Sequence, residues 1–209
     1  MTVPLTNFLA DAFDLESFLF SKPKKYKNSE VMVCKIKNKM NEPVLVQFPK
    51  MLLKNDFTEK YISLEFIKET GYTKKVHTFL DKLNDFIIEY VSTNSEKWFG
   101  KNIPMEKVKM MYKTDTEPEN IKFVFDKSKS ELIDKKNEDI SSELLVKGVT
   151  LECISQLKYL VFTKDTCFVN WEICTAKLHK KVVKVQNFGF VEDPDDESDS
   201  DEEETFTFF

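Results

Sequence analysis

The chain contains no arginine, so all 31 of its basic residues are lysines. A lysine ammonium suits contact with a phosphate, whereas bidentate reading of guanine favours the guanidinium group of arginine. An AT-rich genome produces the same bias, because most arginine codons are GC-rich. If the protein binds nucleic acid, we therefore expect backbone contacts and base stacking in place of sequence reading.

Glycine, histidine and cysteine are also scarce, which excludes several kinds of site. The four glycines stand alone, so the chain contains neither a P-loop nor a dinucleotide-binding fingerprint. The two histidines and four cysteines lack the paired spacing of zinc ligands, and the cysteines are too few and scattered for a disulfide framework. No carboxylate pair stands in an apolar setting that suggests catalysis. We expect no enzymatic activity, no metal and no cofactor.

Long apolar runs are missing as well. No segment is apolar enough over a sufficient length to cross a membrane, and the N-terminus lacks the charged and apolar blocks of a secretion signal. These absences predict an intracellular protein without a membrane partner. The 209 residues suit one domain of ordinary size with a real hydrophobic core.

Charge is divided unevenly along the chain. The segment from Glu192 onward holds ten acidic residues and no lysine, whereas residues 1–191 hold 31 lysines and 26 acids, a net charge of +5. We predict an N-terminal arm at 1–30, a folded domain at 31–191 and a disordered acidic tail at 192–209. The tail ends on three phenylalanines separated only by threonine, which a tail that merely confers solubility does not need.

Hydrophobic periodicity predicts a mainly β protein with one central helix. The predicted strands are 31–40, 42–49, 60–67, 121–126, 148–162 and 167–182, and the predicted helix is 73–92. Residues 94–102 and 127–143 read as loops, and residues 4–20 as a short helix or an aromatic-rich arm. A helix after the third strand indicates an OB-fold, a five-stranded Greek-key barrel, although a small α+β sheet gives the same order of elements.

Lysines gather in three stretches that are candidates for contacts with DNA. Residues 22–54 contain nine lysines and two glutamates. Within that stretch Lys35, Lys37 and Lys39 alternate along a predicted strand, roughly 6–7 Å apart on one face. Such a ladder suits a row of phosphates, although a solvated lysine face is the alternative. The candidate DNA-binding residues are Lys24, Lys25, Lys35, Lys37, Lys39, Lys50, Lys54, Lys97, Trp98, Phe99, Lys101, Lys177, Lys180, Lys181 and Lys184.

Aromatic residues among these lysines are candidates for stacking on bases. Trp98 and Phe99 lie between two lysines, an arrangement typical of single-strand binders, although both rings can instead pack on the apolar face of the preceding helix. Tyr26 and Tyr112 also sit among lysines. For Trp171 the alternation of its strand favours a place in the core.

Three segments resemble the single-stranded-DNA-binding proteins of nucleocytoplasmic large DNA viruses: "EPVLVQFPKM", "TNSEKWFGKNI" and "LECISQLKYLVFTKDTCFVNWEICTAKL". The resemblance covers roughly residues 30–180 in patches. The acidic tail ending in phenylalanine resembles that of the replication single-strand binders of certain tailed phages. The resemblance implies an OB-fold and binding to single-stranded DNA without sequence preference, in viral DNA replication, recombination and repair.

The resemblance also implies two roles for the tail. It competes with DNA for a basic cleft, and its aromatic end binds replication proteins such as a viral DNA polymerase or helicase. The residues concerned are Asp199, Asp201, Glu202, Glu203, Glu204, Phe206, Phe208 and Phe209. A disordered tail that only confers solubility is the alternative.

The expected function is therefore non-enzymatic binding of single-stranded DNA. The protein would act in the host cytoplasm, in viral factories, or in the nucleus, and could be packaged in the virion. A homodimer is compatible with the sequence. The alternative function is that of an acidic-tailed interaction or virion protein without a specific preference for DNA.

Overall fold

The computed structural model describes residues 14–27, 29–57, 60–113, 116–117 and 120–180. The predicted acidic tail and the first part of the predicted N-terminal arm lie outside these residues. The helices are η1 (Leu15–Ser17), α1 (Gly71–Phe99), α2 (Met105–Met111) and η2 (Ser142–Leu144). The strands are β1 (Leu19–Phe20), β2 (Lys24–Lys25), β3 (Met32–Lys37), β4 (Leu45–Leu53), β5 (Tyr61–Phe66), β6 (Thr116–Glu117), β7 (Asn120–Val124), β8 (Glu131–Ile133), β9 (Thr150–Phe162) and β10 (Cys167–Lys180).

Five of these strands close into a barrel. Strand β4 pairs with β5, β5 with β7, β7 with β10, β10 with β9, and β9 again with β4. Within this described ring, β7 and β10 are the parallel pair and the other neighbours are antiparallel. Numbered along the chain, the barrel strands follow the order 1-2-3-5-4, which is a closed Greek key. The pairing confirms the predicted OB-fold and excludes the open α+β sheet.

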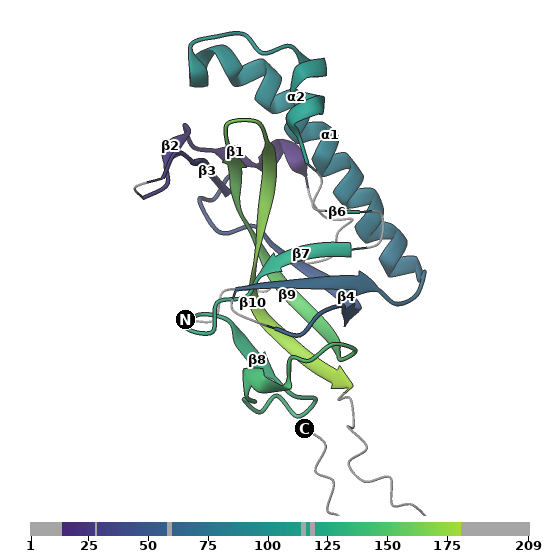
Figure 1. Ribbon diagram of the computed structural model, residues 1–209. Coiled ribbons are helices and arrows are strands. Elements are labelled where there is room, and N and C mark those ends of the chain that lie inside the picture. Colours follow the sequence, from purple (N-terminus) through teal and green to yellow (C-terminus); the bar gives the residue numbers. More distant parts are fainter. Residues whose placement is uncertain (1–13, 28, 58–59, 114–115, 118–119, 181–209) are drawn as a thin grey trace, which may run out of the picture.

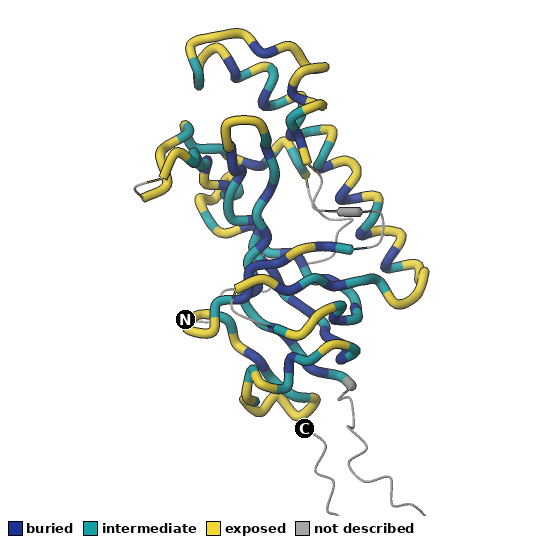
Figure 2. The backbone as a smooth tube through the Cα atoms, viewed as in Figure 1, coloured by how far each residue is buried: buried dark blue, intermediate teal, exposed yellow. Residues whose placement is uncertain are grey.

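Aromatic rings fill the barrel interior. Phe48, Phe123 and Trp171 are almost completely buried. The ring of Phe48 meets Phe123 and Trp171 edge to face, with centroids 5.0 and 5.2 Å apart. This geometry suits the quadrupoles of aromatic rings and stabilises the core beyond the burial of area. The expected core position of Trp171 is confirmed, and Figure 2 shows buried residues along the strands and along α1.

Strands β9 and β10 continue beyond the barrel as a long hairpin (Figure 1). Strand β9 pairs with β4 as far as Gln156 and with β3 from Tyr159 to Phe162. Strand β3 also pairs with the short strands β1 and β2, so the described part of the predicted N-terminal arm lies against the domain. We call the upper part of this sheet, residues 32–37, 159–162 and 167–170, the ribbon.

The long helix α1 connects the barrel to the ribbon. It begins where the Thr70 side chain accepts a hydrogen bond from the amide of Thr73, an N-cap that satisfies a free amide of the first turn. Its 29 residues span about 43 Å. The predicted apolar face is confirmed, because residues at steps of three and four are buried: Val76, Phe79, Leu80, Leu83, Ile87 and Val91.

Contacts at the two ends of α1 show what it covers. Near its start, the Tyr72 hydroxyl donates to the carbonyl of Gln47 on β4 over 2.6 Å. Near its end, the ring of Trp98 lies 6.1 Å from that of Phe162 on the ribbon. The prediction of a loop at 94–102 is wrong for most of its length. The helix continues to Phe99 and ends at Gly100, which adopts a left-handed conformation with φ 68° that favours glycine.

The short helix α2 folds back on α1. The Ser95 hydroxyl oxygen accepts a hydrogen bond from the amide of Ile103, and the Tyr112 hydroxyl donates to Asn84 Oδ1. After α2, the amide of Lys113 donates to the carbonyl of Cys167 at the start of β10. In the described part of the chain, no helix is long and apolar enough to span a bilayer.

Two further predictions about the backbone need correction. Residues 127–143 are not a simple loop, since β8 forms there and pairs in parallel with β10. The strand predicted at 31–40 ends at Lys37, and Asn41 takes a left-handed conformation with φ 65° in the turn that follows. Lys39 therefore lies in that turn, off the predicted ladder.

Candidate nucleic-acid interface

The ribbon has an inner and an outer face because side chains alternate along its strands. On β3, Cys34 and Ile36 are buried toward α1, whereas Lys35 points outward and is exposed. On β9, Leu160 and Phe162 are inward and buried. The outer face thus carries the lysines of β3, and the inner face carries the apolar side chains that α1 covers.

A β-bulge places Tyr159 on the outer face. The partners of Asn170 and Trp171 on β9 are Tyr159 and Leu157, so Lys158 is the extra residue. Because of this bulge, Lys158 and Tyr159 are consecutive residues that both avoid the core, while Leu157 and Leu160 on either side are buried. Bulges often redirect a side chain beside a binding site. Here the bulge also marks the point where β9 leaves the barrel.

The turn between β2 and β3 brings a second ring to Tyr159. Tyr26, which is 40% exposed, lies in this turn, and its amide donates to the carbonyl of Val31. Its ring centroid is 6.3 Å from that of Tyr159, in an edge-on arrangement. The ammonium groups of Lys27 and Lys158 lie 5.5 and 5.6 Å from the centroids of Tyr26 and Tyr159. We call this surface, with Lys24, Lys35 and Lys37, the lysine–tyrosine face.

A shallow hollow of about 160 Å³ lies within the lysine–tyrosine face. Three lysines line it together with the ring of Tyr159: Lys35, Lys37 and Lys158. The described lining includes no carboxylate. A hollow of this kind can hold a phosphate against the ammonium groups while a neighbouring base rests on the tyrosine ring.

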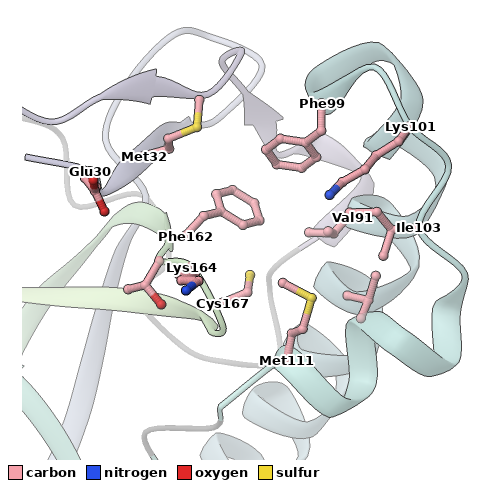
Figure 3. Close-up of a pocket in the computed structure, with 12 residues that line it drawn as sticks. Glu30, Met32, Val91, Phe99, Lys101, Ile103, Met111, Phe162, Lys164 and Cys167 are labelled. Atoms are coloured by element: carbon pink, nitrogen blue, oxygen red, sulfur yellow. The ribbon is translucent and has the colours of Figure 1, made fainter.

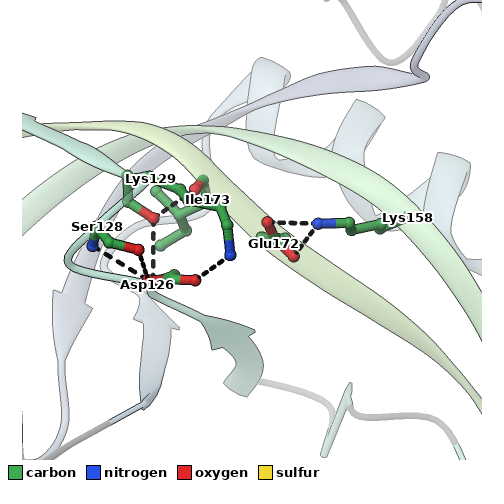
Figure 4. Close-up of polar contacts among 7 residues, drawn as sticks. Asp126, Ser128, Lys129, Lys158, Glu172 and Ile173 are labelled. Atoms are coloured by element: carbon green, nitrogen blue, oxygen red, sulfur yellow. Dashed lines mark hydrogen bonds and ion pairs between the residues drawn. The ribbon is translucent and has the colours of Figure 1, made fainter. Parts of the chain in front are cut away.

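Two acidic residues near this face, Glu172 and Asp126, are paired with lysines (Figure 4). Lys158 Nζ lies 2.6 Å from each carboxylate oxygen of Glu172 on β10. Asp126 accepts hydrogen bonds from Lys129 and from both the amide and the hydroxyl of Ser128. The hydrogen bond from Lys129 is the main reason why the pKa of Asp126 lies well below its ordinary value, with Ser128 adding to the effect. These pairs reduce the repulsion that free carboxylates would exert on a phosphate chain.

A third exposed ring lies on the barrel side of the same surface. Tyr61 on β5 is 47% exposed, and the ammonium groups of Lys122 and Lys60 lie 4.6 and 5.5 Å from its ring centroid. Strands β5 and β7 are the second and third strands of the barrel, whose face binds oligonucleotides in OB-folds. Tyr61 is opposite Val124 on β7, and Val124 is opposite Glu172 on β10. Tyr61 and Glu172 are therefore separated by two strand spacings, about 10 Å across the sheet.

The structure brings together only some of the predicted DNA-binding lysines. Lys24, Lys35 and Lys37 belong to the lysine–tyrosine face, whereas Lys25 is opposite Met32 in the strand pairing and lies on the inner side of the ribbon. In contrast, Lys39 Nζ lies 3.6 Å from a carboxylate oxygen of Asp14. The other two predicted DNA-binding lysines of the first stretch, Lys50 and Lys54, lie on and just after β4, and Lys54 forms an ion pair with Glu65.

The other two predicted clusters lie elsewhere. Lys97, Trp98 and Phe99 form the last turn of α1, Lys101 follows it, and both rings are half-buried against Phe162. Lys177 is opposite Glu152 in the pairing of β10 with β9, and it lies about 23 Å along β10 from Asn170. Lys180 ends β10. Outside the described residues lie Lys181, Lys184, Asp199, Asp201, Glu202, Glu203, Glu204, Phe206, Phe208 and Phe209. Of the two further stacking candidates, Tyr26 is exposed, whereas Tyr112 is buried and its hydroxyl donates a hydrogen bond to Asn84.

Sequence reasoning missed several residues of this surface: Lys158, Tyr159, Tyr61, Lys122 and Lys129. Strict alternation from Leu157 places Tyr159 in the core, and only the bulge reverses this. Tyr61 could have been identified from the sequence, because in "KYISLEF" this aromatic residue follows Lys60 at the start of a predicted strand.

The described residues contain no group of three side chains suited to hold a metal ion. All four cysteines are free. Burial raises the pKa of the Cys34 thiol to about 12, and also raises the pKa values of Cys153 and Cys167. A thiol whose pKa is raised stays protonated and is a poor nucleophile or ligand at neutral pH.

Comparison with known proteins gives distant structural likenesses. No protein-family model matches the chain, and no curated protein matches it. Among solved structures, gp2.5, a single-stranded DNA binding protein encoded by bacteriophage T7, is 11% identical, with a TM-score of 0.47 over 71% of this chain and 98% of that one. The single-stranded DNA-binding protein from bacteriophage Enc34 is 15% identical, with a TM-score of 0.42 over 81% and 96%. The same Enc34 protein in complex with single-stranded DNA is 16% identical, with a TM-score of 0.38 over 80% and 98%.

Proposed function

We propose that the protein binds single-stranded DNA through the lysine–tyrosine face, without sequence preference. One observation carries the proposal: the bulge at Lys158 exposes Tyr159 beside Tyr26, within a hollow lined by three lysines. Exposed rings flanked by ammonium groups suit a strand whose bases are unpaired, because every base has a face that stacks and every phosphate a charge that the lysines neutralise.

The same chemistry disfavours duplex DNA and sequence reading. In a duplex the base faces are stacked inside the helix, so the tyrosines have nothing to stack on. Ammonium groups contact phosphates as point charges and lack the planar fork that reads guanine. Tyr61, flanked by Lys60 and Lys122, extends the surface across the barrel and suits further nucleotides of the same strand.

We further propose a role in viral DNA replication, recombination and repair, which the resemblance of the sequence implies and with which this binding mode is consistent. Transient single strands in these processes need a protein that covers them regardless of sequence. The acidic, phenylalanine-ended C-terminal segment would supply contacts with other replication proteins, such as a polymerase or helicase. We place this activity inside the infected cell, in the cytoplasm or the nucleus.

A fluorescence anisotropy titration tests the proposal. A labelled oligothymidylate and a duplex of the same length are titrated with the full chain at several salt concentrations. We expect clear preference for the single strand. If four to six phosphates are neutralised, the log–log salt slope for the single strand should be about −3 to −4, using roughly 0.7 per contact.

Two results would contradict the proposal. Equal, weak binding to both oligonucleotides would favour an acidic-tailed interaction protein without a preference for DNA. A salt slope near zero would show that the lysines do not contact phosphates.

A further inference from the structure

Glu172 on β10 holds one of the three lysines that line the hollow of the lysine–tyrosine face. Lys158 Nζ lies 2.6 Å from each of its two carboxylate oxygens. The side chains of Lys158 and Glu172 are 25% and 17% exposed, so salt and water screen this pair less than they screen a fully exposed pair. Glu172 itself is not part of the described lining of the hollow.

The other two lysines of the hollow keep their charge uncompensated. Lys37 Nζ donates to Oδ1 of Asn41 over 2.7 Å, and an amide oxygen does not neutralise an ammonium group. Within the described residues, neither Lys35 nor Lys37 forms an ion pair. The hollow thus contains two lysines whose charge is available to a phosphate and one whose charge is balanced from inside the protein.

A further lysine lies on the other side of Glu172. Figure 4 shows Lys129 and Lys158 approaching Glu172 from opposite sides. The pKa of Lys129 is raised, mainly by its hydrogen bond with Asp126 and to a smaller extent by the charge of Glu172. The two ammonium groups and the two carboxylates together carry no net charge, so this part of the surface is neutral.

A lysine that already has a carboxylate partner gains little when it contacts DNA. A free ammonium group that neutralises a phosphate releases a cation condensed on the DNA, and this release favours binding at low salt. If a phosphate takes Lys158 from Glu172, the carboxylate is left partly buried without its partner, which costs free energy. The carboxylate then attracts a cation from solution, which offsets the cation that the DNA released.

We propose that Glu172 limits the affinity of the lysine–tyrosine face for single strands by acting as the internal counterion of Lys158. This role rests on the proposed binding of single strands at that face, and it assigns the residue that restrains the strength of binding. Lys35 and Lys37 contribute to the salt dependence, whereas Lys158 makes no net contribution. Weaker binding mainly speeds dissociation, so the strand is easier to release when it is copied.

Anisotropy titrations of a labelled oligothymidylate with the full chain, at several salt concentrations, test this role. Glu172→Gln makes the charge of Lys158 available, so we expect the log–log salt slope to steepen by about 0.7, the value for one phosphate contact. The gain in affinity over the parent should therefore grow about fivefold when the salt concentration falls tenfold. A damaged fold lowers affinity, so a gain distinguishes this role from a structural one.

Replacing both partners, Lys158→Gln with Glu172→Gln, gives the sharper test. The two amides can keep a hydrogen bond, and the change removes one charge of each sign. If Glu172 balances Lys158, the double variant should have the salt slope of the parent. If Lys158 instead contributes a phosphate contact in the parent, the magnitude of the slope should fall by about 0.7, which would overturn the proposal.

Glu30 provides a matched control on the opposite side of the ribbon. It lines a pocket of about 330 Å³ between the end of α1, α2 and the turn from β9 to β10, together with Phe162 (Figure 3). Figure 3 places Glu30 across this pocket from Lys101, and among the described residues Glu30 forms no ion pair. Glu30→Gln makes the same change in charge but frees no lysine, so the salt slope should stay that of the parent.

The parent and the two single variants separate the possible failures. A parent without preference for the single strand would contradict the proposed function, and the role of Glu172 with it. A parent that binds as proposed, but whose slope is the same as that of Glu172→Gln, would overturn only the role of Glu172. Equal steepening by Glu30→Gln would assign the gain to the overall charge of this region and would also overturn that role.

Discussion

Tyr159 and Phe162 are three residues apart on β9, and each lies among other rings and near lysines, yet their surroundings differ. Tyr159 is half-exposed on the outer face of the ribbon, edge-on to Tyr26 and next to Lys158. Phe162 is 6% exposed on the inner face, with the rings of Phe99 and Trp98 at 5.2 and 6.1 Å. One strand thus presents an exposed ring to the solvent and a buried ring to a helix.

This difference shows what a ring beside a lysine does and does not imply. Trp98 and Phe99 have lysines on both sides in the sequence, but they lie in the last turn of α1 and their rings pack on Phe162. The residues that can stack on a base are those whose backbone points them away from α1. Burial against the helix therefore separates rings that stabilise the fold from rings that can bind.

The largest effect is expected on the inner face. Phe162→Ala should lower the free energy of unfolding by about 3 kcal/mol, the lower end for a buried phenylalanine, because one side of its ring already borders a pocket. Urea unfolding followed by circular dichroism measures this change. A variant as stable as the parent would show that the packing of the ribbon on α1 contributes little.

The outer face should respond in binding and not in stability. Tyr159→Ala should weaken binding of an oligothymidylate by about 1–3 kcal/mol, as expected for the loss of one stacked base. Tyr159→Phe keeps the aromatic face and should bind nearly as well as the parent. If Tyr159→Ala instead unfolds early and binds normally below its melting temperature, the two faces do not have separate roles.

Lysines on and off the outer face sharpen the comparison. Replacing Lys35 and Lys37 by alanine should reduce the magnitude of the log–log salt slope by about 1.4, roughly 0.7 for each lost phosphate contact. Replacing Lys68 and Lys82 by alanine removes the same charge away from this surface. Equal slopes for the two double variants, measured by anisotropy, would show that the lysines of β3 form a solvated strand face and do not contact phosphates.

The smallest expected effect concerns thiol chemistry. Cys34, Cys153 and Cys167 are buried and their pKa values are raised, that of Cys34 to about 12, so at pH 8 the reactive thiolate is scarce. Cys174 is half-buried, and burial raises its pKa as well. We expect a disulfide reagent to modify Cys174 first in the native protein and the other three only on unfolding. Rapid reaction of all four thiols, followed by mass spectrometry, would show that the inner face opens readily.

Local patterns in the sequence predicted most of the elements but not how they join. Alternation located all six long strands, and steps of three and four located α1, because each of these elements has one buried face. Closure of the barrel depends on pairing between β7 and β10, which are distant in the chain, and no local pattern specifies it. The end of α1 was misjudged because the half-buried rings of Trp98 and Phe99 pack against Phe162, a contact over more than sixty residues of sequence.

The candidate site was only half predictable for the same reason. Lys35 and Lys37 alternate with buried residues, so their outward direction followed from the pattern. Tyr159 did not follow, because the extra residue at Lys158 changes which side chains face outward. The ion pair of Lys158 with Glu172 likewise depends on the register of two strands.

Photocrosslinking tests most directly the claim that single strands bind on the outer face of the ribbon. An oligothymidylate in which single thymines are replaced by 5-iodouracil is irradiated with the full chain, and the modified residues are identified by mass spectrometry. The account predicts crosslinks at Tyr26 and Tyr159, with Tyr61 as a further site. Crosslinks at Trp98 or Phe99 in place of these tyrosines would contradict it.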